Sequence, residues 1–382
     1  MIRKFKNIVL QNLINIPGYR TNRKIIVFES DDWGMIRMSS AETIEKLKNK
    51  GYKISQCPYN SNDHIESDED IKALAETLLS VKDSKSNPAK FTINNVVANP
   101  DFNKIKESNF KNYHYKIFTD TLKENKDSQN VMSLYKEGIK NNIFQPQLHG
   151  REHINLRLWL KRLQESDPKT TEAFNHDMYT IHHSGSISGR RDNLDAFGNK
   201  TITGDNFDYN KIVKEAQRIF TETWGFKSKS FIAPCYVWHP SLEKVLKDEG
   251  IRYIQGVRVQ VIPIDNTSFQ IEKKYHYTGQ KNKLDQSYLI RNCKFEPTES
   301  GRNNVVENTL KEIKLSFSYK KPAIISSHRV NYIGSLNPNN RKQNLKLLDQ
   351  LLITIIKLWP DAEFMSSDQL GDLITKTNKC VE

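Results

Sequence analysis

Two histidines four residues apart, His149 and His153, are the first residues of this sequence whose types and spacing suggest chemistry. They follow a short apolar segment, residues 142–148, which we expect to be a strand. If His149 opens a helix, His153 lies one turn further along the same face, and both imidazoles point the same way. Neutral imidazoles in this arrangement suit a divalent metal ion, although helices with two solvent-facing histidines show the same spacing.

Adjacent carboxylates in the segment Ser30-Asp31-Asp32-Trp33-Gly34 supply the third ligand that a histidine pair lacks. With Asp32 as that ligand, one carboxylate and two imidazoles leave positions on the metal open for water and substrate. Asp31 would accept a proton from the attacking water, and His328 would protonate the leaving group. Such a site hydrolyses an amide or an ester. A purely structural interpretation also exists, since aspartates often cap helices and a lone histidine is often part of a core.

The elements that must position these residues alternate between apolar strands and amphipathic helices. We expect strands at residues 24–28, 91–97, 142–148, 230–234, 251–254, 286–295, 322–325 and 363–365, with helices between most of them. This βα alternation recurs about seven times, which indicates a parallel sheet covered by helices. A distorted (β/α)7 barrel with loop insertions is the first interpretation of this α/β pattern, and a doubly wound open sheet is the second.

One catalytic barrel domain is predicted over residues 21–382, preceded by an amphipathic helix within residues 1–20. The apolar stripe of that helix either packs on the domain or lies on a membrane surface. Insertions are expected at about residues 51–70, 101–130 and 166–207. The last of them contains a glycine- and serine-rich stretch with two arginines, residues 182–191, which we interpret as a surface loop.

Composition limits the class of function. The chain has 382 residues, 37% of them hydrophobic, so it can bury a large core. Its net charge of +13 is spread along the chain, so we expect no nucleic-acid partner and only a weak preference for anionic partners, such as an anionic membrane surface. The four cysteines lack the spacing of a zinc ribbon or a disulfide framework. Without a signal-peptide pattern, we expect a cytoplasmic protein, at most peripheral to the inner face of the membrane.

Four of the expected strands end in residues that can take part in catalysis or metal binding. These are Asp31-Asp32, His149, Pro234-Cys235-Tyr236 and Ser327-His328. In parallel α/β folds the carboxyl ends of the strands share one face, so residues remote in sequence meet there. We therefore predict one site at this face, where the aromatic residues Trp33, Tyr236 and Trp238 would suit the face of a sugar.

This set of motifs resembles that of the NodB-like polysaccharide deacetylases, a group of carbohydrate esterases, over about residues 24–370. The resemblance implies a distorted (β/α)7 barrel and one divalent metal ion, with zinc expected first and cobalt, nickel, iron or manganese as alternatives. It also implies a role for each matching residue: Asp31 as base, His328 as acid, Asp32, His149 and His153 as metal ligands, and Pro234-Cys235-Tyr236 with Trp33 at the substrate and oxyanion.

The sequence departs from the family pattern at two of these motifs, and the usual Asp-Trp motif of the family is not identifiable. Gly150 follows the first histidine, where the family usually has serine or threonine, and Ile232 and Ala233 stand where an arginine usually sets the base. Arg37, Arg151 or Arg329 is a candidate replacement. The expected reaction is removal of N- or O-acetyl groups from an acetylated carbohydrate, either a glycan or a glycan precursor. Two alternatives remain open, a catalytically silent glycan-binding module on the same fold and a barrel hydrolase for another amide or a phosphoester.

Overall fold

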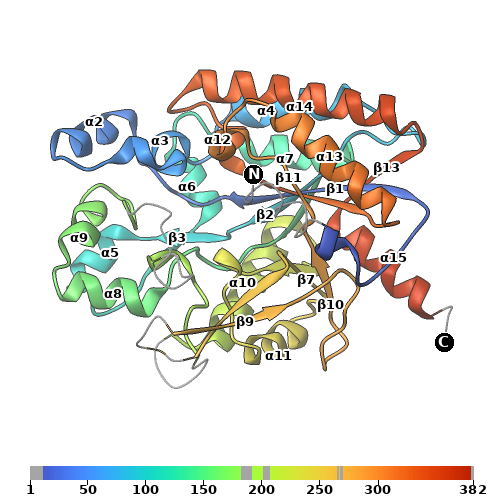
Figure 1. Ribbon diagram of the computed structural model, residues 1–382. Helices are drawn as coiled ribbons and strands as arrows, with labels where there is room; N and C mark the ends of the chain where they lie inside the picture. The colour runs from blue at the N-terminus through green and yellow to red at the C-terminus, as the bar shows by residue number, and fades with distance from the viewer. Residues whose placement is uncertain (1–11, 182–191, 201–206, 265, 267–269, 380–382) are drawn as a thin grey trace, which may run out of the picture.

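One parallel sheet forms the centre of the molecule (Figure 1). The computed structural model describes residues 12–181, 192–200, 207–264, 266 and 270–379. Within these residues the sheet has nine strands: β1 (Lys24–Trp33), β2 (Phe91–Asn95), β5 (Phe144–Leu148), β6 (Ser230–Ile232), β7 (Tyr253–Gly256), β10 (Ser287–Ile290), β11 (Cys293–Lys294), β12 (Ala323–His328) and β13 (Ala362–Met365).

The sheet closes into a barrel through the short connection between β10 and β11. The strands follow the order β10-β7-β6-β5-β2-β1-β12-β11, and β13 pairs with the start of β1. The amide of Arg291 donates to the carbonyl of Gly256 at the end of β7 (2.9 Å), and the amide of Asn292 donates to the carbonyl of Ile324 in β12 (3.1 Å). Counting β10 and β11 as one position and leaving β13 aside, seven strand positions form the ring. The predicted distorted (β/α)7 barrel is confirmed, and the open sheet is not formed.

Helices cover the outside of the barrel (Figure 1). They are α4 (Asp68–Leu79), α7 (Val131–Lys140), α10 (Tyr209–Trp224), α11 (Ser241–Asp248), α13 (Val305–Ser318), α14 (Pro338–Leu358) and α15 (Ser367–Lys379). Their sequences place an apolar stripe on the sheet side. In α10, for example, Ile212, Ala216 and Phe220 are buried at four-residue spacing, whereas Lys211 and Lys214 are exposed.

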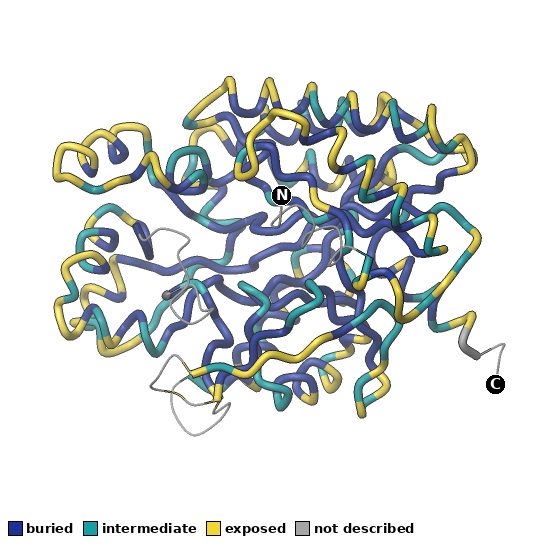
Figure 2. Tube along the Cα trace, in the orientation of Figure 1, coloured by how far each residue is buried: buried dark blue, intermediate teal, exposed yellow. Residues whose placement is uncertain are grey.

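The core lies between the sheet and these helices, and Figure 2 shows the buried strands inside an exposed outer layer. All residues of β1 after Lys24 are buried, since one face of the strand meets the barrel interior and the other meets the helices. Phe28 of β1 stacks on Phe91 of β2 with ring centroids 5.1 Å apart. This packing fixes the carboxyl end of β1, where the paired aspartates lie.

Shorter elements gather at the carboxyl ends of the strands, to the left in Figure 1. They include α2 (Ala41–Asn49), α3 (Pro58–Asn62), α5 (Phe102–Glu107), α6 (Phe118–Glu124), α8 (Leu156–Gln164), α9 (Pro168–Phe174) and the pair β3 (Ala98–Pro100) and β4 (Tyr115–Ile117). The remaining elements are α12 (Pro297–Ser300), the hairpin of β8 (Val259–Pro263) and β9 (Ile271–Tyr275), and the 3-10 helices Ile54–Gln56, Asp192–Leu194, Pro234–Tyr236 and Arg329–Asn331. The expected insertion 101–130 therefore contains two helices and a strand, although its polar composition predicted mainly loop.

The predicted N-terminal helix falls mostly outside the described residues, which begin at Asn12. Residues 12–15 are helical, and the chain then turns toward β1. The Lys321 ammonium group donates to the carbonyls of Pro17, Gly18 and Tyr19 at 2.7–2.9 Å, which holds this turn on the barrel. The stretch 182–191 also lies outside the described residues. In the part of the chain that is described, we find no helix with the length and hydropathy to span a bilayer.

Candidate metal centre

The two aspartates of β1 face the same cavity because the strand is bulged at this point. Between Ser30 and Trp33, β1 advances three residues while β2 advances two. In a regular strand successive side chains point to opposite faces, whereas the extra residue lets both Asp31 and Asp32 point inward. Asp32 has φ +75, in the left-handed region that aspartate occupies more readily than most residues.

His149 and His153 lie in a loop after β5, so the prediction that His149 opens a helix is wrong. The next helix, α8, begins only at Leu156. Gly150 has φ +101, a conformation that a right-handed helix does not contain and that glycine adopts without strain. The loop nevertheless turns both imidazoles toward Asp32, with their ring centroids 5.1 Å apart.

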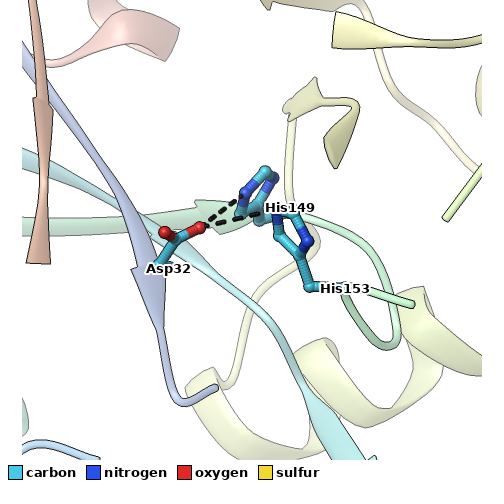
Figure 3. Close-up of side chains that lie close together, drawn as sticks. All are labelled: Asp32, His149 and His153. Carbon is cyan, nitrogen blue, oxygen red and sulfur yellow. Dashed lines mark ion pairs between the residues drawn. The ribbon is translucent and has the colours of Figure 1, made fainter. Parts of the chain in front are cut away.

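Asp32, His149 and His153 converge on one point at the carboxyl end of the barrel, as Figure 3 shows. Asp32 Oδ1 lies 3.3 Å from His149 Nε2 and 3.6 Å from His153 Nε2. One ligand atom from each residue lies within 4.8 Å of the others. All three side chains are buried. The convergence that the sequence predicted for these three residues is confirmed.

The donor atoms of this triad fit a divalent metal ion. Two ligands about 2.0–2.1 Å from a tetrahedral zinc ion are about 3.3 Å apart, close to the separations from Asp32. The Nδ1–H of His149 donates to the carbonyl of Ile232 at 2.9 Å, which leaves Nε2 as a lone-pair donor facing Asp32. Burial lowers the pKa of His153 to about 4, so that its imidazole is neutral at pH 7. Imidazole and carboxylate together suit zinc and several other first-row metals.

Asp31 is held by an arginine that the sequence analysis missed, Arg291. The Nη atoms of Arg291 donate to both carboxylate oxygens of Asp31 at 2.6 and 2.7 Å, and its Nε donates to Glu29 at 2.6 Å. Asn94 donates a further hydrogen bond to Asp31 Oδ1 at 2.8 Å. Burial raises the pKa of the Asp31 carboxyl, but the Arg291 guanidinium outweighs this effect and holds it below its usual value. Asp31 is therefore ionised at neutral pH.

His328 ends β12 beside Asp31, with Nε2 3.7 Å from Asp31 Oδ2. Its Nδ1 is 2.5 Å from Glu296 Oε1, and Asn331 donates to the other oxygen of Glu296 at 2.6 Å. Burial lowers the pKa of His328, but the Glu296 carboxylate more than compensates and raises it to about 9. An imidazolium at this position carries a proton toward the cavity, as a catalytic acid requires.

The turn Pro234–Tyr236 brings two side chains to the same cavity. Cys235 and Tyr236 both have positive φ, +57 and +60, and both line the cavity, whereas Pro234 is buried beneath them. The Tyr236 hydroxyl accepts a hydrogen bond from Arg291 at 3.2 Å. The Tyr236 amide donates to the carbonyl of Ala233 at 2.9 Å, so this amide is engaged within the turn. The oxyanion role of the turn stays a prediction.

Trp33 belongs to the core, so the prediction that it contacts substrate is wrong. Its side chain is completely buried, and its indole N–H donates to Ser30 Oγ at 2.9 Å. The ring packs edge-on against Tyr135 of α7. The bulge that turns both aspartates inward directs the next side chain outward, under the helices. Trp238 is likewise buried, and its indole N–H donates to Glu243 at 3.3 Å.

These groups share a cavity of about 610 Å³, a volume typical of small-molecule sites. The triad, Asp31 and His328 lie on its polar wall. Apolar side chains line other parts of it, namely Ile14, Leu194, Val257 and Val259. The cavity therefore places the candidate reactive centre beside an apolar surface that can contact the carbon atoms of a ligand.

Arg291 and Glu296 are the functional residues that sequence reasoning missed. Arg291 directly follows β10, and Glu296 lies two residues after the end of β11. The position of Arg291 at the end of the strand Ser287–Ile290 was the available signal, because strand ends carry the other site residues. Arg37, Arg151 and Arg329 do not ion-pair with Asp31 in the described residues. Because Arg291 holds Asp31, the arginine missing before Pro234 no longer favours a silent module, whereas the missing Asp-Trp motif still does.

Neither a protein-family model nor a curated protein sequence matches the chain. Among solved structures, a candidate glycoside hydrolase/deacetylase from Parabacteroides distasonis is 9% identical with a TM-score of 0.50, over 93% of this chain and 72% of that one. A candidate polysaccharide deacetylase from Pseudomonas aeruginosa PAO1 is 8% identical with a TM-score of 0.44, over 92% and 91%. A 4-alpha-glucanotransferase from Thermococcus litoralis is 11% identical with a TM-score of 0.43, over 92% of this chain and 40% of that one. The likeness to the Parabacteroides distasonis structure shows the fold of the chain, a distorted α/β barrel.

Proposed function

We propose that the chain is a metal-dependent carbohydrate deacetylase that hydrolyses N- or O-acetyl groups. One observation carries this proposal: Asp31 and His328 lie beside the triad of Asp32, His149 and His153 in a single cavity. A base, an acid and a set of metal ligands at one point are the parts that acyl hydrolysis needs. The fold that the chain shares with deacetylase structures agrees with this reaction class.

A divalent ion held by Asp32, His149 and His153 would polarise the acetyl carbonyl and lower the pKa of an attacking water. Asp31 is ionised and accepts the proton of that water as the C–O bond to the acetyl carbon forms. The guanidinium of Arg291 fixes both oxygens of Asp31, so the base keeps one orientation. His328 then donates its proton to the departing sugar nitrogen or oxygen as the acyl bond breaks. Acetate and the free sugar amine or hydroxyl are the products.

The test combines metal analysis with acetate release. Purified protein should hold close to one divalent ion per chain and release acetate from at least one member of a panel of N- and O-acetylated sugars. Asp31→Asn should keep the ion and lose activity by about 10²-fold or more, because general-base catalysis typically contributes that much. Asp372→Asn is the matched control, since Asp372 lies on α15 and pairs with Lys229 and Arg252 away from the cavity.

Two results would overturn the assignment. If the Asp31→Asn variant is as active as wild type, Asp31 is not the base. If protein with full metal content releases no acetate from any sugar in the panel, the deacetylase proposal fails as a whole.

A further inference from the structure

Four basic side chains line the cavity, and two of them lack a carboxylate partner. Arg291 is paired with Glu29 and Asp31, and Lys294 is paired with Glu299. For the other two, Arg37 and Arg258, the described residues provide no ion pair to a carboxylate. Two unpaired guanidinium groups at a candidate active site therefore need an explanation.

Arg37 is the more unusual of the two because it is buried. Only 5% of the residue is exposed, and its Nε has no hydrogen-bond partner among the described residues. Its guanidinium lies 5.9 Å from the ring centre of Tyr59, which also lines the cavity. The carboxylate of Asp63 is nearby, but Asp63 accepts its hydrogen bond from Arg329. A buried cation without a hydrogen-bonded anion is costly, so its retention favours a ligand that supplies one.

The segment that carries Asp32 also positions Arg37. The chain leaves Asp32 through Gly34, at φ +81, and the amide of Ile36 donates to Asn99 at 2.9 Å. These contacts fix the backbone on both sides of Met35, which lines the cavity with Arg37. Arg37 and Asp32 line the same cavity, and the charge of Asp32 is one of those that act on the guanidinium. A substrate with its acetyl group at the triad would meet Arg37 close to that group.

Arg258 lies across the barrel from Arg37. It follows β7, which is three or four strand positions from β1 in the ring of seven. Its guanidinium sits 5.4 Å from the ring centre of Tyr275, and both residues line the cavity. Tyr275 is 59% exposed, at the end of β9, a strand exposed over most of its length (Figure 2). An exposed aromatic face beside a cation suits a sugar ring that carries an anionic group.

None of the acidic side chains that line the cavity forms an ion pair with these two cations in the described residues. Asp32 faces His149 and His153 instead. Asp31 accepts hydrogen bonds from Arg291, Glu296 accepts one from His328, and Glu299 pairs with Lys294. Glu312 accepts a hydrogen bond from the backbone amide of Lys294 at 2.8 Å. The carboxylates therefore have partners of their own, and the positive charges of Arg37 and Arg258 stay available.

We infer that the acylated substrate is an acidic glycan, whose carboxylate or phosphate group binds Arg37 next to the metal triad. Arg258 and Tyr275 bind an adjoining sugar residue and its anionic group. This inference rests on the proposed function for the position of the acetyl group. Carboxylate and phosphate groups both present anionic oxygens that accept charge-assisted hydrogen bonds from a guanidinium.

Binding tests the inference independently of catalysis. Isothermal titration calorimetry would compare D-glucuronate, glucose 6-phosphate and glucose on the metal-loaded wild type. At least one anionic sugar should bind about tenfold tighter than glucose or better, since a hydrogen bond to a charged group is worth that much. Arg37→Gln should abolish the difference, and a preference for glucuronate over the phosphate identifies the carboxylate as the ligand. Equal affinity for all three sugars, including no measurable binding, overturns the inference.

Two further variants separate recognition from folding. Arg258→Gln alters a partly exposed residue and should weaken binding of an acidic disaccharide, digalacturonate, more than that of the monosaccharide. Arg218→Gln is the matched control, because Arg218 lies on the outer face of α10 and pairs with Glu222. It removes the same charge and should leave the preference intact. A loss of preference in Arg218→Gln equal to that in Arg37→Gln would mean that overall charge, not the cavity, attracts the anion.

Acetate release then distinguishes a failure of this inference from a failure of the proposed function. Acetylated oligogalacturonate and its carboxyl-reduced counterpart differ only in the anionic group. The wild type should show a lower KM for the acidic form, and Arg37→Gln should raise that KM with a smaller effect on kcat. Equal KM values with activity on both would retain the deacetylase and reject the acidic substrate. Arginine-dependent binding without acetate release would retain the anion site and reject the deacetylase.

Discussion

We predict that the free energy of unfolding of the Glu296→Gln variant depends on pH differently from that of the wild type. The carboxylate of Glu296 is fully buried and lies 2.5 Å from Nδ1 of His328, whose side chain is 17% exposed. The pKa of His328 is about 9 against an ordinary 6.5. At about 1.4 kcal/mol per pKa unit, this difference contributes about 3 kcal/mol to the free energy of unfolding.

The sign follows from the raised pKa of the folded state. The folded protein holds the proton of His328 more tightly than the unfolded chain, so the contribution is complete below about pH 6.5 and is lost as the pH rises through about 9. Glutamine keeps the size of the side chain and removes the charge. Glu296→Gln should therefore destabilise the protein by about 2–3 kcal/mol at pH 6 and by less than about 1 kcal/mol at pH 10.

Urea unfolding of wild type and variant at pH 6 and pH 10, followed by circular dichroism, measures both differences. Glu307→Gln is the control, because Glu307 is exposed on α13 and pairs with Lys311 one turn away. It should change stability little at either pH. If Glu296→Gln destabilises the protein equally at pH 6 and pH 10, the ion pair does not raise the pKa of His328, and the assignment of His328 as a protonated acid loses its basis.

Two further predictions concern buried groups. Arg291→Gln leaves two buried carboxylates, Glu29 and Asp31, without their cation, and should cost about 3–5 kcal/mol of stability in urea unfolding; a loss as small as that of Arg218→Gln would show that the pair is not buried in solution. Trp33→Ala should cost about 3–5 kcal/mol because it empties a core position, while metal content measured by elemental analysis stays near that of wild type. Unchanged stability together with a higher KM for the substrate would instead indicate that Trp33 lies in the cavity.

The triad consists of three side chains, of which Asp32 lies far in the sequence from His149 and His153. The sequence predicted these residues correctly from their types and from their positions after apolar segments. Strand ends in a parallel sheet meet at one face, so the strand pattern alone predicts that Asp32 and His149 converge. The structure places their ligand atoms 3.3 Å apart.

The sequence pattern did not predict the local backbone conformation at these residues. The spacing of His149 and His153 is compatible with one turn of helix, and the loop that replaces the helix depends on Gly150 and on the contact of His149 with Ile232. A four-residue spacing constrains a helix but does not require one. The same limit applies to β1, where the bulge turns two consecutive side chains inward and directs Trp33 into the core.

By itself, the sequence determined the α/β class, the seven-fold alternation and the convergence of Asp32, His149 and His153, because hydrophobic periodicity and residue type can be read locally. Only the tertiary structure decided which cation holds Asp31 and which carboxylate holds His328. Arg291 is 260 positions from Asp31 in the chain, and Glu296 is 32 from His328. Ion pairs of this kind depend on which strands become neighbours in the closed ring, and no local pattern records that choice.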